Sequence, residues 1–257
     1  MKPYPLLISS FILFLAGILC QSSASAQIIT FGAKGGLSVP NLTSGDTGNP
    51  LSEGYSSRLG ADAAVFAEYH MSKIFSTTVG FEYCAQGGKK SGMQAFEVPA
   101  EYAAFVPPGT KYLYADFKSE AKFDYMMLPV MARVRYAFGI SPFSVYVSAG
   151  PFVSILMKAE QETRGASTIY LDEAGTQALP AGVVSFNADN NIRSDLNRYN
   201  VGGVGLVGFE FSLEPYAVFI EAGGNFGFIP IQKGSSHGKN YTGAAVITMG
   251  CSYTFRN

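Results

Sequence analysis

The chain has 257 residues, of which 47% are hydrophobic and only 14% are charged, and its formal net charge is −1. Soluble domains typically contain about 25% charged residues, so this composition favours a membrane protein. The balanced charge disfavours nucleic acid as a partner, because proteins that bind it carry a basic surface.

The N-terminus has the features of an export signal. Lys2 precedes an apolar run over residues 6–19, and small residues occupy positions 24–26. This order is typical of a cleaved signal peptide. We therefore expect residues 1–26 to be removed on export and residues 27–257 to form one domain.

Two other modes of membrane attachment are disfavoured. Cys20 suggests a lipoprotein, but Leu19 stands where a lipid-attachment motif needs a small residue. After Ala26, no apolar run reaches the 18 or more residues of a membrane helix. A soluble β protein and a closed transmembrane barrel remain, since only helices and closed barrels satisfy every backbone group in lipid.

Alternation of apolar with small or polar residues runs along the exported part. Between residues 29 and 39 the odd positions are apolar or small, whereas the even positions are Thr, Gly, Lys and Ser. A period of two predicts a strand with two different faces. The predicted strands cover residues 29–39, 58–69, 75–84, 121–138, 143–157, 199–213, 216–228 and 242–256.

The links between these strands alternate in length. Short links such as "GISP" and "EP" follow every second strand, and the other links are long. Outer-membrane barrels have long loops outside the cell and short turns in the periplasm. The fold is therefore predicted to be all-β, an eight-stranded antiparallel transmembrane β-barrel in the outer membrane, with lipid around its apolar face.

One strand breaks the alternation. Apolar residues are odd over 123–127 but even over 132–136, which would turn Arg133 and Arg135 towards lipid. Pro129 cannot donate a ladder hydrogen bond and is tolerated mainly at bulges. We therefore predict a bulge beside Pro129 that turns both arginines inward.

The inward charged residues predict an ion-pair network. An eight-stranded barrel has a lumen that side chains just fill, so unpaired charges there would be costly. We expect a plug rather than a pore, in which Glu221 contacts Lys34 or Arg133. The predicted network comprises Lys34, Glu68, Arg133, Arg135, Glu210 and Glu221. A second, wetter layer is expected from Arg58, Asp62, Glu82, Lys122 and Asp124.

Several strand segments resemble the PorT-like outer-membrane β-barrel proteins. They are "FGAKGGLSV", "YMMLPVMARVRY", "AGPFVSILM", "GLVGFEF" and "FIEAGGNFGF". The chain has "EAGG" where members often carry "EARY", so Glu221 lacks that arginine. The family includes a component implicated in a secretion system, and the resemblance thus implies an accessory role in an envelope or secretion assembly.

The spacing of Gly203, Gly205 and Gly208 matches a dinucleotide-binding pattern. Such a site needs a turn and a helix after the strand, whereas alternation continues here. We interpret these glycines as part of the barrel wall and expect no cofactor.

Catalysis and metal binding have weak support. His237 lies beside two serines but lacks a nearby acid, and His70 is distant in sequence. Cys84 and Cys251 belong to strands that are not neighbours, so both thiols should be free. We expect no enzyme and no metal site.

The two longest inserts are the candidates for a specific function. Residues 87–120 contain six aromatic residues among prolines, which indicates either a contact surface for a protein partner or a cap packed on itself. Residues 158–198 have a polar composition typical of a mobile loop. A non-enzymatic barrel that acts through these loops is preferred, with a small solute channel and an envelope enzyme as alternatives.

Overall fold

The structure, a computed structural model, describes residues 28–46, 48–234 and 238–256. The predicted signal peptide, Cys20, and the loop residues Ser235, Ser236 and His237 lie outside these residues. No helix in the described part of the chain is long and apolar enough to cross a membrane.

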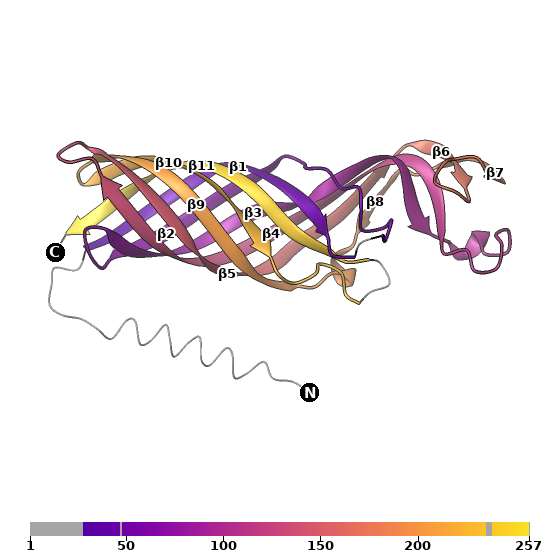
Figure 1. The fold of residues 1–257 in the computed structure, drawn as a ribbon, viewed down its shortest axis with the longest axis horizontal. Coiled ribbons are helices and arrows are strands. Elements are labelled where there is room, and N and C mark those ends of the chain that lie inside the picture. Colours follow the sequence, from indigo (N-terminus) through magenta and orange to yellow (C-terminus); the bar gives the residue numbers. More distant parts are fainter. Residues whose placement is uncertain (1–27, 47, 235–237, 257) are drawn as a thin grey trace, which may run out of the picture.

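Eight long strands form a closed antiparallel ring (Figure 1). The pairing of β1 with β11 and of β4 with β5 joins the strands into a cylinder. The prediction of an eight-stranded antiparallel barrel is thus confirmed. The strands are β1 (Ile28–Ser44), β2 (Gly60–His70), β3 (Phe75–Glu97), β4 (Tyr112–Ala137), β5 (Phe143–Arg164), β9 (Tyr199–Leu213), β10 (Tyr216–Gly227) and β11 (Asn240–Arg256).

Strands β3, β4 and β5 continue beyond the ring at the end that carries the long links (Figure 1). We call this part, residues 87–120 and 158–198, the extension. It also contains β6 (Ala166–Tyr170), β7 (Ala178–Ser185) and β8 (Ala188–Asn191), with short 3-10 helices at Ala100–Tyr102 (η1) and Arg193–Asp195 (η2). Residues 158–198, expected to be a mobile loop, thus contain strands paired with the rest of the extension.

The extension is ordered by an apolar cluster of its own. Leu113, Ile169 and Leu179 are buried together in a cluster that is separate from the core inside the ring. Phe117 and Phe186 stack with ring centroids 4.7 Å apart. The polar composition of residues 158–198 hid these few apolar residues, which reach partners on β4 through long-range pairing.

The outer face of the ring is apolar and ends in two aromatic bands. This layout is typical of barrels in lipid, where aromatic girdles flank an apolar belt. At the short-turn end the band contains the mutually packed rings Phe143, Phe209, Phe211, Tyr216, Tyr253 and Phe255. At the other end it contains Phe226, Phe228 and Tyr241.

The predicted bulge beside Pro129 is absent. All odd residues of β4 from Phe123 to Arg135 face inward, so the strand has no break in parity. The register shift lies instead at β5, opposite Asp124 and Tyr125. The arginines do face inward. The reasoning failed because Phe123 and its odd neighbours fill an apolar part of the lumen that was taken for the lipid face.

Glycine in the wall makes room for inward aromatic rings. Tyr146 on β5 is directly opposite Gly208 on β9, and its ring lies across the glycine. A Cβ at Gly208 would be 2.1 Å from Tyr146 Cζ. Phe152 has the same relation to Gly202. This packing accounts for Gly208, whereas a Cβ at Gly205 would meet no neighbour within 4 Å, and all three glycines of the pattern lie within strand β9.

Gly208→Val is expected to lower the free energy of unfolding by about 1–3 kcal/mol, because overpacking forces ring and backbone to move. Gly205→Val is the matched control, since a Cβ at this outward glycine has no neighbour within 4 Å. Urea unfolding in lipid vesicles measures both. Equal effects of the two substitutions would contradict this role of Gly208.

Candidate functional site

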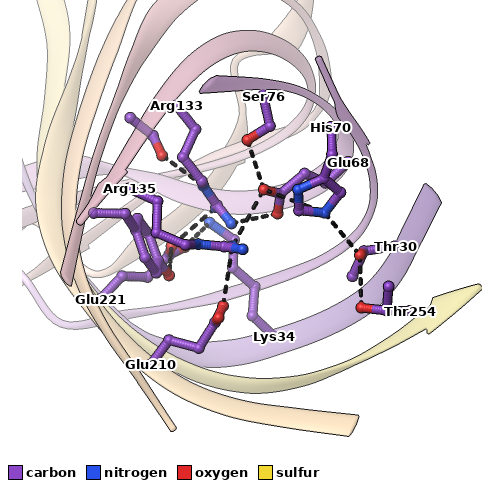
Figure 2. Close-up of polar contacts among 12 residues, drawn as sticks. Thr30, Lys34, Glu68, His70, Ser76, Arg133, Arg135, Glu210, Glu221 and Thr254 are labelled. Carbon is purple, nitrogen blue, oxygen red and sulfur yellow. Dashed lines mark hydrogen bonds and ion pairs between the residues drawn. The ribbon is translucent and has the colours of Figure 1, made fainter. Parts of the chain in front are cut away.

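The structure brings all six predicted lumen residues into one network (Figure 2). They come from β1, β2, β4, β9 and β10, and strand alternation points each of them inward. The network occupies the half of the ring nearer the short turns, where inward aromatic rings such as Phe66 and Tyr146 pack beside it.

Arg133 is the centre of the network. Its Nη1 donates to Glu68 Oε2 at 2.7 Å, and its Nε donates to Ser148 Oγ at 2.9 Å. Its Nη2 is 3.8 Å from Glu221 Oε2, and its guanidinium carbon is 4.0 Å from the centroid of the Tyr146 ring. The side chain is 3% exposed. Arg133 therefore joins two carboxylates in a place closed to bulk water.

Lys34 connects a second pair of carboxylates. Its Nζ donates to Glu221 Oε1 at 2.6 Å and lies 3.3 Å from Glu82 Oε2. Glu221 also accepts hydrogen bonds from Tyr146 Oη at 2.9 Å and from Thr248 Oγ1 at 3.4 Å. Both bases proposed as partners for Glu221 are therefore in place, and its charge has four neighbours that stabilise it.

Arg135 closes the network towards the short turns. Its Nη2 lies 3.2 Å from Glu68 Oε1 and 3.2 Å from Glu210 Oε2. His70 Nε2 is 3.8 Å from Glu68 Oε1 and 3.0 Å from Thr30 Oγ1. Arg135 is partly exposed, which is consistent with its position near the barrel end.

This arrangement fills the cross-section with paired side chains. The cavity beside Lys34, Glu82, Arg133 and Glu221 measures about 10 Å³, which is room for about one water molecule. The network links separate strands of the barrel, because its oppositely charged side chains attract one another where solvent does not screen them.

The expected second layer was wrong in its composition. Glu82 belongs to the network through Lys34, and Arg58 pairs with Glu120 near the rim at 2.8 Å. Lys122 and Asp124 are on the outward parity of β4. The space above the network is filled by Phe123, Tyr125, Met127, Leu156 and other apolar side chains. Lys122 and Asp124 were assigned to the lumen because the odd residues of this part of β4 were assigned to the lipid face.

Sequence reasoning missed Tyr146 and Ser148, which both contact Arg133. Their signal was the inward parity of β5, where each directly faces a residue of β4 or β9.

Cys84 is buried and Cys251 is exposed, and both thiols are free, as predicted.

A larger cavity lies at the mouth of the barrel, between the ring and the extension. It measures about 360 Å³ and is lined by Tyr55, Lys90, Phe117, Ile192, Leu196 and others. Lys90 Nζ lies 4.3 Å from the centroid of the Tyr55 ring. Burial raises the pKa of the Tyr55 hydroxyl to about 12, so it stays neutral.

The sequence matches the family model of the outer membrane protein beta-barrel domain over residues 21–233. The closed ring, its apolar outer face and its aromatic bands agree with that family. The chain belongs to this family and is an outer-membrane β-barrel, with the long links outside the cell and the short turns in the periplasm.

Solved structures with partial similarity include Neisserial surface protein A, with 15% identity over 91% of this chain and 100% of that chain and a TM-score of 0.38. Ail, the attachment invasion locus protein of Yersinia pestis, has 10% identity over 88% of this chain and 98% of that chain, with a TM-score of 0.37. The outer membrane protease OmpT from Escherichia coli has 11% identity over 91% and 99%, with a TM-score of 0.34. No curated protein matches the chain. The assignment rests on the family model.

Proposed function

We propose that the protein is a non-enzymatic outer-membrane barrel, closed to solutes, that docks a protein partner through its extracellular extension. The observation that carries the proposal is that strands β3, β4 and β5 run past the ring and build a separately packed unit there. A barrel that served only to span the membrane would not need this second unit.

The surface of the extension supports docking. Its apolar cluster packs several aromatic residues, in line with the cap alternative, yet Phe105 is 67% exposed and Val183 is 73% exposed. These two apolar side chains lie outside the lipid belt, where they are available for contact with another protein. The resemblance to PorT-like proteins favours a partner in an envelope or secretion assembly.

Excision of the β6–β7 hairpin tests this proposal. Phe186 N donates to Gly165 O at 2.9 Å, so residues 166–185 can be replaced by a short glycine link without stretching the chain. Crosslinking in intact cells, followed by mass spectrometry, should capture a partner with the wild type and lose it with the excision. The heat-dependent gel shift shows whether the excised variant still forms a folded barrel. If that folded variant captures the partner as well as the wild type does, the proposal is contradicted.

The network predicts a closed lumen. Purified wild-type protein in planar lipid bilayers should show negligible conductance, because paired side chains from five strands cross the lumen. A steady open channel in the wild type would instead support the solute-channel alternative.

A further inference from the structure

Three potential metal ligands meet inside the barrel at the upper edge of the ion-pair network, to which one of them, Glu82, also belongs. Asp62 on β2 is directly opposite Cys84 on β3, and Glu82 is two residues before Cys84 on the same inward face. Their ligand atoms all lie within 4.8 Å of one another, and all three residues are buried. The juxtaposition follows from the register of two neighbouring strands and does not depend on a loop.

Asp62 has no hydrogen-bond partner for either carboxylate oxygen, although the residue is only 2% exposed. A buried charged group normally has paired or hydrogen-bonded neighbours, because its desolvation is costly. The bases of the network contact other carboxylates: Lys34 contacts Glu82 and Glu221, and Arg133 contacts Glu68. Asp62 therefore has both oxygens available for a cation.

The described lumen contains more acidic than basic side chains. The basic side chains there are Lys34, Arg133 and Arg135, whereas the acidic ones are Asp62, Glu68, Glu82, Glu210 and Glu221. His70 lies at the opposite end of β2, next to Glu68. The excess of carboxylates favours an additional cation near Asp62.

The sulfur of Cys84 is surrounded by donors that suit a thiolate. Gln86 Nε2 lies 3.3 Å from Sγ, and Asn225 Nδ2 lies 3.6 Å from it. Gln86 Nε2 also donates to Asn225 Oδ1 at 2.9 Å, which holds the two amides in place. Outer contacts of this kind orient metal ligands and stabilise their charge.

We propose that Asp62, Glu82 and Cys84 bind one divalent transition-metal ion, with Zn²⁺ as the best match. Zn²⁺ accepts thiolate at about 2.3 Å and carboxylate at about 2.0–2.2 Å, so small side-chain rotations bring the three ligands to one ion. A thiolate ligand disfavours Mg²⁺ and Ca²⁺. The ion replaces the thiol proton, which leaves to solvent, and so adds one net positive charge. Water would supply the fourth ligand, as it does at zinc sites with three protein ligands.

The sequence predicts no metal site when only its two distant histidines are considered as ligands. The ligands are two carboxylates and a thiol on adjacent strands, and the interval of about twenty residues between Asp62 and Glu82 in the chain matches no usual motif.

Metal content and cobalt spectroscopy test the proposal. The full exported chain is refolded with a chelator, given one equivalent of Zn²⁺ or Co²⁺, and desalted. Elemental analysis should find one Zn²⁺ per wild-type chain, with the same content in Cys251→Ser, whose thiol is exposed, and loss of bound metal in Cys84→Ser and Asp62→Asn. The Co²⁺ form of the wild type should show a thiolate charge-transfer band in the near ultraviolet that Cys84→Ser lacks. Zn²⁺ should raise the unfolding temperature of the wild type.

The heat-dependent gel shift shows which variants are folded. Equal zinc content in wild type and folded Cys84→Ser would overturn the proposal. The spectrum of wild-type protein alone also decides, because absence of the thiolate band from the folded, Co²⁺-treated protein would show that Cys84 does not bind the ion.

Discussion

Arg133→Met is expected to lower the free energy of unfolding by about 3–5 kcal/mol, since removing one partner of a buried ion pair leaves an uncompensated charge. Glu68 would lose its 2.7 Å hydrogen bond to Arg133, and Glu221 would lose a nearby positive charge. Methionine retains much of the apolar contact with Tyr146, so the measured loss reports mainly on charge. Equilibrium unfolding in urea with lipid vesicles, followed by tyrosine fluorescence and gel shift, measures the change.

Two further variants make that result specific. Arg256→Met breaks an exposed pair with Glu214 and should leave stability unchanged, because exposed pairs contribute little. Combining Arg133→Met with Glu68→Gln should recover part of the lost stability, since the unpaired carboxylate is then neutral. If the double variant is less stable than Arg133→Met by the full effect of Glu68→Gln alone, charge pairing is not the source of the loss.

Alternation carried most of the fold prediction because lipid and lumen impose opposite demands on alternate residues. Lys34 and Glu210 each occupy a position whose neighbours two residues away are small or polar, and both face inward. The rule failed on β4, where the lumen itself turns apolar around Phe123 and Met127. There an apolar residue does not distinguish the two faces, and only pairing with β3 and β5 does.

The network's membership depended on register, which the sequence shows poorly. Glu82 was placed in an upper layer from its distance to a turn, yet the register sets both Glu82 and Lys34 opposite Ala64 and so brings them together. Tyr146 attracted no attention as one of 15 tyrosines, although its place opposite Gly208 makes it a contact of Arg133 and Glu221. The extension was missed for a related reason, since its strands are stabilised by partners far away in the chain.

The lipid-facing side of the ring gives the sharpest test of membrane placement. Val207 lies on the outward face of β9 and is 60% exposed, well inside the band between the two aromatic girdles. Val207→Arg should lower the free energy of unfolding in lipid by about 2–4 kcal/mol, as arginine does near the bilayer midplane.

Val183→Arg is the matched control. Val183 lies on β7 in the extension and is 73% exposed, so its environment is water and a charge there costs little. The same substitution at two exposed valines therefore distinguishes a lipid environment from a water environment. Stability in vesicles and assembly in the outer membrane of cells should both be reduced for Val207→Arg and normal for Val183→Arg. If the two variants were equally stable in lipid, the apolar face of β9 would not be in contact with the bilayer, and the placement of the ring in the membrane would be wrong.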